Sequence, residues 1–180
     1  KYIANFSVFQ SIPDSWALDQ LFPIVPIHRL NERPTVQATL CDVTCDSDGE
    51  VDRFVDMRDV KDSLPMHELT DGEPYYVAVC LIGAYQDVLG DYHNLFGRVH
   101  EAHVTLTKNG QPRVTHVEPG DDTADVLHLF GYDPEAMVES VQAQVDACVD
   151  AKSLSRTKAR RLVADYTAAL HDYTYLDFPS

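Results

Sequence analysis

The hydrophobic pattern of this chain changes its period once, at residues 116–122, which read H-V-E-P-G-D-D. Before this point, residues 1–117 are rich in β-branched and aromatic side chains, with Pro and Gly between short runs, a composition typical of strands. After it, residues 121–172 carry Ala, Asp, Val and Leu at helical spacing. We therefore predict a mainly β domain over residues 1–120, of the Greek-key barrel or sandwich type, followed by an α-helical end over residues 121–180.

Four runs in the first part predict strands. The run at residues 35–43 alternates between apolar and polar side chains, as a half-buried strand does, and residues 50–55 are predicted to pair with it. The run at residues 74–85 is almost continuously apolar and predicts a strand buried on both faces. The fourth predicted strand covers residues 2–9.

Turn and capping residues mark the remaining elements. Asn109-Gly110 lies between two alternating runs and predicts a β-hairpin over residues 102–117. Pro13 is placed to begin a short helix within residues 12–22. Three helices are predicted in the second part of the chain, and their predicted N-caps are Thr123, Asp133 and Ser155.

The charge balance argues against one class of partner. The chain has 29 acidic and 14 basic residues and a formal net charge of −15, whereas nucleic-acid binding needs clustered Lys and Arg, so no nucleic-acid partner is predicted. No window approaches about 18 uninterrupted apolar residues, so no membrane span is predicted either. The four cysteines form no C-x-x-C pair, which favours reduced thiols and a cytoplasmic setting.

Residues 44–50, T-C-D-S-D-G-E, place a thiol and several carboxylates next to a glycine. An EF-hand calcium loop does not fit, because with Gly49 at its sixth position Thr44 and Val55 would stand where carboxylates are required. The scattered His and Cys residues form no zinc-binding pattern, and no metal site is predicted. Spacing alone leaves two interpretations: an acidic surface turn with an incidental Cys45, or a turn that presents a thiol and a carboxylate to a cationic group.

Four stretches of the sequence closely resemble the C-terminal part of bacterial biosynthetic arginine decarboxylases. They are I-A-N-F-S-V-F-Q-S-I-P-D-S-W-A-L-D-Q-L-F-P-I-V-P-I-H-R-L (3–30), D-V-T-C-D-S-D-G (42–49), L-P-M-H-E-L (64–69) and L-I-G-A-Y-Q-D-V-L-G-D-Y-H-N-L-F-G (81–97). The resemblance extends over almost the whole chain. It implies the β-domain and helical end of a fold type III enzyme that uses pyridoxal 5′-phosphate, without the (β/α)8 barrel that precedes the β-domain in this family.

The resemblance also implies an activity, the conversion of arginine to agmatine and CO2 in putrescine and spermidine biosynthesis. It implies a homodimer or higher oligomer with active sites shared between subunits, and Mg2+ as a second cofactor, although no magnesium site is recognisable in these residues. The Schiff-base lysine belongs to the barrel in this family, so the chain alone is expected to be inactive. It opens on Lys1 without an initiator Met, and we expect it to be a piece of a longer polypeptide.

The resemblance assigns roles to individual residues. Cys45 matches the cysteine that returns a proton to Cα after CO2 has left, a task for which a thiol is a competent acid. Asp46 matches the carboxylate that binds the distal cationic group of the substrate, and a carboxylate can pair with a guanidinium through two parallel hydrogen bonds. Asp48 is assigned to the same task by its charge. Tyr85 in G-A-Y matches a residue whose hydroxyl binds the cofactor phosphate, and Phe96 in N-L-F-G matches an aromatic residue that lines the pocket.

Several points stay open at this stage. The predicted strand over residues 74–85 would hold the Tyr85 hydroxyl in a fixed place. Asn5-Phe6 stands where ornithine decarboxylases carry Asp-Gly, and Trp16 and Asp19 receive no role.

Two alternatives to an arginine decarboxylase stay open. One is another basic amino-acid decarboxylase of the same plan, acting on diaminopimelate or carboxynorspermidine. The other is a non-catalytic acidic β-domain that binds a ligand or partner.

Overall fold

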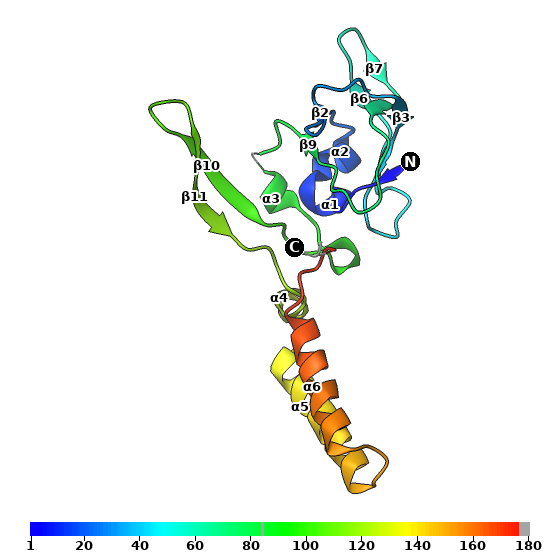
Figure 1. Ribbon diagram of the computed structural model, residues 1–180, viewed down its shortest axis with the longest axis vertical. Helices are drawn as coiled ribbons and strands as arrows, with labels where there is room; N and C mark the ends of the chain where they lie inside the picture. The colour runs from blue at the N-terminus through cyan, green and yellow to red at the C-terminus, as the bar shows by residue number, and fades with distance from the viewer. Residues whose placement is uncertain (84, 177–180) are drawn as a thin grey trace. The chain divides into compact units, whose positions relative to one another are not determined.

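The computed structural model describes residues 1–83 and 85–176. The chain divides into two compact units, Lys1–Phe96 and Gly97–Ser180. The first unit is built mainly from short strands, and the second from a long β-hairpin and helices (Figure 1). The prediction of a mainly β fold with a helical end is confirmed, whereas the domain boundary after residue 120 stays a prediction. In the described part of the chain, no helix combines the length and the apolarity needed to cross a membrane.

The strands of the first unit are short: β1 (Tyr2–Ile3), β2 (Ile24–Pro26), β3 (Val36–Ala38), β4 (Leu40–Cys41), β5 (Glu50–Val51), β6 (Phe54–Val55), β7 (Val60–Lys61), β8 (Leu64–Met66) and β9 (Val77–Val79). β4 is the centre of a three-stranded sheet, with β1 parallel to it on one side and β5 antiparallel on the other. The other strands form antiparallel pairs, β2 with β9, β3 with β8 and β6 with β7. The pairing of β5 with β4 confirms the predicted neighbours.

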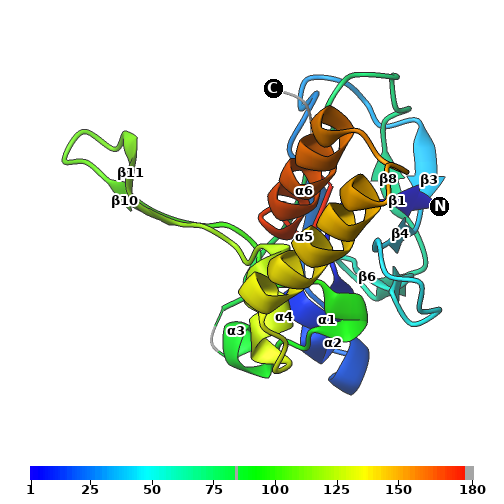
Figure 2. The ribbon, with the colours of Figure 1, turned by 90° about the horizontal axis from the view of Figure 1, so that it is seen from below.

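Apolar side chains from most of these strands fill one core, whose burial is the main driving force for folding this unit. Its buried members are Val8, Ile12, Phe22, Ile24, Ala38, Leu40, Val51, Phe54, Leu64 and Met66. Four short helical segments also belong to the unit: α1 (Val8–Ser11), α2 (Pro13–Leu18), α3 (Gln86–Leu89) and the 3₁₀ turn η1 (His93–Leu95). The helices α1, α2 and α3 lie together, as Figure 2 shows.

The predicted strand over residues 2–9 is wrong beyond Ile3, because the chain turns into α1 at Val8. The hydroxyl of Ser7 accepts a hydrogen bond from the Gln10 N–H at 3.3 Å, and a carboxylate oxygen of Asp42 accepts one from the Val8 N–H at 2.8 Å. These acceptors satisfy N–H groups of the first helical turn, which have no partner within a helix. The predicted helix at Pro13 is confirmed as α2, which ends at Leu18.

The doubly buried strand predicted over residues 74–85 is also wrong. Among the described residues of this run, 74–83 and 85, only Val77–Val79 form a strand, β9, and these residues are half-buried. Leu81 has a left-handed backbone conformation, with a φ of 62°, and its side chain is exposed. A continuous apolar run predicts burial only where every residue keeps an extended backbone, and this segment leaves that conformation soon after Val79.

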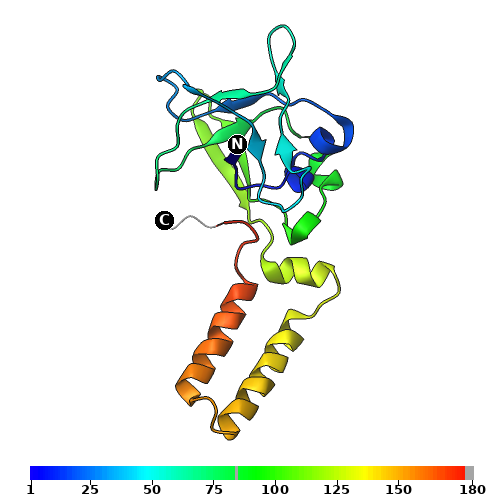
Figure 3. The ribbon, with the colours of Figure 1, turned by 90° about the vertical axis from the view of Figure 1, so that its right-hand side faces the viewer.

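The second unit begins with the predicted hairpin, β10 (Glu101–Leu106) and β11 (Pro112–Glu118), whose strands are antiparallel. It continues with α4 (Thr123–Leu129), α5 (Pro134–Asp150) and α6 (Arg156–Leu170), of which α5 and α6 lie side by side (Figure 3). Asp133 and Ser155 cap α5 and α6 as predicted. The cap of α4 is Asp122 rather than Thr123, because the Asp122 and Asp125 side chains form a capping box.

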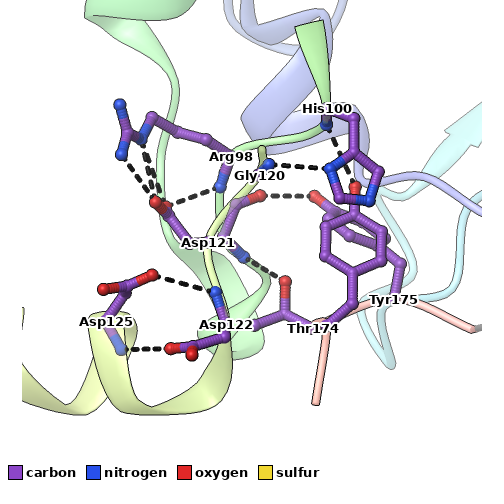
Figure 4. A network of polar contacts seen from close by, with 10 residues as sticks. Arg98, His100, Gly120, Asp121, Asp122, Asp125, Thr174 and Tyr175 are labelled. Atoms are coloured by element: carbon purple, nitrogen blue, oxygen red, sulfur yellow. Dashed lines mark hydrogen bonds and ion pairs between the residues drawn. The ribbon is translucent and has the colours of Figure 1, made fainter. Parts of the chain in front are cut away.

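A set of polar contacts ties three segments of the second unit together (Figure 4). The buried carboxylate of Asp121 accepts hydrogen bonds from the backbone and the guanidinium of Arg98. The hydroxyl of Tyr175 donates to the Gly97 carbonyl at 2.8 Å, and the Gly97 N–H donates to the hydroxyl of Thr174 at 3.0 Å. The segment that follows α6 is thereby fixed to the segment that precedes the hairpin.

Candidate functional site

The turn that carries Cys45 connects β4 to β5 around a buried carboxylate. Asp42 is 5% exposed, and it accepts hydrogen bonds from the Val8 N–H at 2.8 Å, the Thr44 N–H at 2.9 Å and the Thr44 hydroxyl at 2.7 Å. A buried carboxylate needs such donors, since an unpaired charge in a protein interior is costly. Asp42 therefore fixes the first half of the turn to the start of α1.

The end of the turn requires a glycine because the chain approaches Asp42 closely. A Cβ atom at Gly49 would lie 2.1 Å from Oδ1 of Asp42, well inside van der Waals contact. The Asp42 N–H donates to the Gly49 carbonyl at 2.7 Å, and the Gly49 N–H donates to the Asp46 carbonyl at 3.2 Å. The Asp-Gly step of the sequence thus marks a close backbone approach and closes the turn.

Cys45 lies on the exposed part of this turn. Its S–H donates to Oδ1 of Asn94 with an S···O distance of 3.5 Å, and its backbone N–H donates to the same oxygen at 3.2 Å. Asn94 lies in η1 and has a left-handed backbone conformation, with a φ of 55°, which Asn tolerates better than most residues. The thiol is accessible and attached to a second segment of the same unit.

The two carboxylates of the turn have different partners. Oδ2 of Asp46 lies 3.1 Å from Nε2 of His93, while its Oδ1 accepts a hydrogen bond from the Asp48 N–H at 2.9 Å. Oδ2 of Asp48 accepts a hydrogen bond from the indole N–H of Trp16 at 3.3 Å. Asp46 is half-buried and Asp48 is exposed, and both carboxylates can accept further hydrogen bonds from a cationic ligand.

A buried phenylalanine supports these partners from α1. Phe9 is 2% exposed, and its ring centroid lies 4.3 Å from that of His93 and 5.1 Å from that of Trp16, which it meets edge to face. Aromatic contacts of this kind restrict the orientation of the rings. Cys45 and the two aspartates lie on one turn, and the sequence prediction missed the rings that support it; the roles of Cys45, Asp46 and Asp48 stay predictions.

The roles of His93 and Asn94 also escaped the sequence prediction, although both lie in the stretch H-N-L-F-G. Two features of the sequence could have indicated them. Asn tolerates left-handed backbone geometry, and the His next to it can pair with a carboxylate. Their partners lie more than 40 positions earlier in the chain, with a separation of 49 residues between Cys45 and Asn94. No periodic pattern reports a contact at such a distance.

The two residues predicted to contact the cofactor lie elsewhere in the first unit. Tyr85 precedes α3 with a φ of 82° and is 73% exposed. It does not lie at the end of a rigid buried strand, so the reasoning behind its fixed position is wrong. Phe96 directly follows η1 and is half-buried. The roles of Tyr85 and Phe96 stay predictions.

A cavity of about 380 Å³ opens beside the turn. Four of its eleven lining residues carry carboxylates; the lining consists of Ser15, Trp16, Asp19, Gln20, Leu21, Ser47, Asp48, Glu50, Val51, Asp52 and Arg53. The pKa of Glu50 lies below its ordinary value because the Lys1 ammonium and the Thr39 hydroxyl donate hydrogen bonds to the carboxylate. Within the described residues, no three His, Cys, Asp or Glu side chains are arranged to hold a metal ion.

Comparison with known proteins shows which proteins this chain is similar to. Residues 123–176 match the family described as the arginine decarboxylase C-terminal helical extension. The whole chain is 48% identical to the biosynthetic arginine decarboxylase of Deinococcus radiodurans over 180 residues. The chain is related to the C-terminal part of biosynthetic arginine decarboxylases. It is also 45% identical, over 177 residues and 98% of its length, to the biosynthetic arginine decarboxylase of Bacteroides thetaiotaomicron.

A solved structure supports the same relationship. The crystal structure of the biosynthetic arginine decarboxylase SpeA from Campylobacter jejuni superimposes with a TM-score of 0.83 and 34% sequence identity, over 97% of this chain and 29% of that chain. The chain spans 27% of the length of the Deinococcus relative and 28% of the Bacteroides relative. The resemblance to arginine decarboxylases predicted from the sequence is therefore confirmed, and it concerns about a quarter of those enzymes.

Proposed function

We propose that this chain is the C-terminal portion of an arginine decarboxylase, which converts arginine to agmatine and CO2. The observation that carries the proposal is the 48% identity over the whole chain to a protein of that name. The exposed turn with Cys45 and Asp46 supports it, because decarboxylation of arginine needs an acid for Cα and an anion for the guanidinium. The other basic amino-acid decarboxylases gain no support from the three relatives described above, which all carry the arginine decarboxylase name.

Cys45 is the proposed acid. When the bond between Cα and the carboxyl carbon breaks, CO2 leaves. The electron pair of the broken bond remains at Cα. The S–H of Cys45 then gives its proton to that carbon, a C–H bond forms, and the thiolate regains a proton from water. The exposure of Cys45 agrees with this role, since a residue buried in its own fold could not reach a substrate.

Asp46 is the proposed partner of the guanidinium, and Asp48 is a second carboxylate on the same turn. A guanidinium that pairs with a carboxylate forms charge-assisted hydrogen bonds, which are about twice as strong as neutral ones. Oδ2 of Asp46 already faces His93, so the substrate would use the remaining lone pairs of this carboxylate. The side chain of arginine separates its guanidinium from Cα. Two different residues, Asp46 for the guanidinium and Cys45 for Cα, can therefore act on the two ends of one substrate.

The proposed cofactor is pyridoxal 5′-phosphate, which when bound would delocalise the electron pair left at Cα. The chain fits one part of this group: the exposed phenol of Tyr85 can donate a hydrogen bond to a phosphate oxygen, and Phe96 would line the pocket. The lysine that anchors the cofactor is expected in a barrel outside these residues, so the chain alone is expected to release no CO2. We further propose a cytoplasmic homo-oligomer in which the turn completes the site of a partner subunit, with Mg2+ as a second cofactor.

The roles of Cys45 and Asp46 are tested in the longer enzyme, the full-length protein of which this chain is proposed to be the C-terminal portion. Two variants of it are needed. Cys45→Ala should lower kcat at least about 100-fold with a small change in KM, since general acid catalysis contributes 10²–10⁴-fold. Asp46→Asn should chiefly raise the KM for arginine, by about 10-fold or more, because a charge-assisted hydrogen bond is lost. The measurement is the formation of agmatine from arginine, because CO2 leaves before Cys45 acts and its release alone does not report the return of the proton.

Matched controls come from the same chain. Cys148→Ala changes an exposed thiol on α5, and Asp56→Asn changes an exposed carboxylate outside the turn; both should leave kcat and KM unchanged. Mixing the Cys45→Ala enzyme with a variant that lacks the barrel lysine should restore part of the activity if subunits share their sites. An enzyme that forms agmatine at the normal rate without Cys45 contradicts the assigned role.

A further inference from the structure

Two consecutive residues of η1 hold two consecutive residues of the turn. Asn94 accepts both the S–H and the backbone N–H of Cys45 through one oxygen, at 3.5 and 3.2 Å. His93 places Nε2 3.1 Å from the carboxylate of Asp46. The thiol and the carboxylate are therefore each tied to η1 by a separate side chain.

The backbone of η1 is held in an unusual conformation at this point. Asn94 and Leu95 have φ angles of 55° and 64°, in the left-handed region that residues other than glycine adopt only rarely. Such conformations persist where the surrounding contacts determine them, and Asn adopts this one more readily than most residues. Here the left-handed geometry at Asn94 accompanies the contact of its amide oxygen with the thiol.

The contact of Asn94 determines both the position of the Cys45 side chain and the direction of its S–H bond. Because one oxygen accepts from both the backbone and the sulfur of Cys45, the side chain is fixed relative to its own peptide group. The S–H bond is directed at a known acceptor, so the proton has a defined starting position. A misplacement of about 1 Å in a reacting group can reduce a rate about 100-fold.

The contact of His93 acts on the carboxylate in the same way. The Asp46 carboxylate is held through both oxygens, one facing His93 and the other accepting the Asp48 N–H. The imidazole is itself supported by the buried ring of Phe9, with centroids 4.3 Å apart. The orientation of the carboxylate therefore depends on a series of contacts that ends at the buried side chain of Phe9.

We propose that Asn94 and His93 are positioning residues for the decarboxylation, Asn94 for the Cys45 thiol and His93 for the Asp46 carboxylate. This inference rests on the proposed function. It requires that loss of Asn94 disturb the return of the proton, and that loss of His93 disturb the binding of arginine. The two residues are adjacent, yet their variants should differ in which kinetic constant they change.

The Asn94 test uses the longer enzyme and two variants. Asn94→Gly removes the acceptor but keeps a residue at ease in the left-handed region, whereas Asn94→Asp keeps an acceptor oxygen of the same reach. Asn94→Gly should lower kcat at least about 10-fold and change the KM for arginine less than about twofold. Asn94→Asp should recover most of that loss.

A stereochemical measurement separates positioning from a merely structural role. In D2O, the deuterium that enters agmatine at the former Cα should have one configuration in the wild-type product. Asn94→Gly should give a mixture of configurations, because a displaced thiol allows water to deliver the deuterium from either face. Product of a single configuration together with an unchanged kcat would overturn the proposal for Asn94.

The His93 test has the opposite signature. His93→Leu should raise the KM for arginine at least about fivefold, while kcat changes less than about twofold and the configuration of the product stays single. His93→Gln retains an N–H donor and should restore part of the affinity. A fall in kcat with an unchanged KM would overturn the role assigned to His93.

A chemical measurement tests the Asn94 contact without any catalysis. Iodoacetamide modification of the Cys45 peptide, followed by mass spectrometry, should be at least about threefold faster in Asn94→Gly than in the wild type, because the thiol no longer has to give up its hydrogen bond before it reacts. Modification of Cys148, which is exposed on α5, should be the same in both. Equal modification rates of Cys45 would overturn the contact itself.

The combined results distinguish two kinds of failure. If the longer enzyme forms no agmatine, the proposed function fails and the positioning roles fail with it, whatever the modification rates. If the wild type forms agmatine and Cys45→Ala is impaired, but Asn94→Gly has the kcat and the modification rate of the wild type, only the positioning inference fails.

Discussion

Oδ2 of Asp42 accepts a hydrogen bond from the backbone N–H of Val8 at 2.8 Å, across 34 positions of the chain. This contact joins the first residue of α1 to the first residue of the turn that carries Cys45. The same α1 supplies Phe9, which supports His93 and Trp16. The buried carboxylate of Asp42 thus connects the core of the first unit with the proposed catalytic turn. Variants of Gly49 and of Asp42 itself test that connection.

Gly49→Ala should destabilise the first unit by about 1–3 kcal/mol, the usual cost of overpacking a filled site. The added methyl group would lie 2.1 Å from Oδ1 of Asp42 and 2.8 Å from the hydroxyl of Thr44. The measurement is urea unfolding followed by the fluorescence of Trp16, the single tryptophan of the chain. Gly83→Ala is the matched control, because a Cβ at Gly83 meets no atom within 4 Å; equal losses in the two variants would contradict this account of Gly49.

Asp42→Asn should also destabilise the first unit, although it preserves the shape of the side chain. One of the two acceptor oxygens becomes an NH2 group that faces donors, and each buried donor left without an acceptor costs about 1–3 kcal/mol. Urea unfolding measures the loss. The iodoacetamide rate of Cys45 should rise in parallel, since the turn loses its anchor, whereas Asp56→Asn on an exposed residue should change neither quantity.

Local signals in the sequence were sufficient for much of the fold. The hairpin at Asn109-Gly110 and the caps Asp133 and Ser155 were predicted correctly, because each depends on residues within a few positions of one another. The start of α1 was missed, because one of its acceptors comes from Asp42, 34 positions away. The run at residues 74–85 misled the prediction, because apolarity does not report the left-handed backbone at Leu81.

In the candidate site, too, features formed by neighbouring residues could be predicted from the sequence, and contacts between distant residues could not. Cys45, Asp46 and Asp48 are neighbours in the chain, so both their grouping in one turn and the family resemblance could be recognised from the amino-acid sequence alone. The ties of this turn to Asn94 and His93 required the fold, because 49 positions separate Cys45 from Asn94. Residue type made these two residues plausible partners for a thiol and a carboxylate, but only the geometry paired them.

Tyr175→Phe should destabilise the second unit by about 0.5–1.5 kcal/mol, the net contribution of a typical hydrogen bond. The Tyr175 hydroxyl donates to the Gly97 carbonyl at 2.8 Å from a buried position, so the variant removes the bond without leaving a large cavity. Thermal unfolding followed by far-UV circular dichroism reports on the helices of this unit. Tyr132→Phe, at an exposed tyrosine, is the control, and a loss there as large as at Tyr175 would argue against the contact.

Asp122 should make the stability of the second unit depend on acidic pH. Burial disfavours its charged form, but hydrogen bonds from the Asp125 N–H and from the imidazole of His171 outweigh burial and hold the pKa of Asp122 below its ordinary value of 3.8. A carboxylate whose pKa is lower in the folded state stabilises that state above its ordinary pKa, and this contribution disappears as the pH falls through the lowered value. The loss is therefore expected below about pH 4.

Asp122→Asn isolates this contribution, because Asn retains an acceptor oxygen for the cap of α4 but cannot ionise. The wild type should be the more stable protein at neutral pH, and its advantage in urea unfolding should shrink as the pH falls below about 4. Glu139→Gln removes one exposed carboxylate from α5 and separates the effect of Asp122 from that of net charge. An advantage of the wild type over Asp122→Asn that stays constant into the acidic range would show that the cap, and not its charge, stabilises this end of the unit.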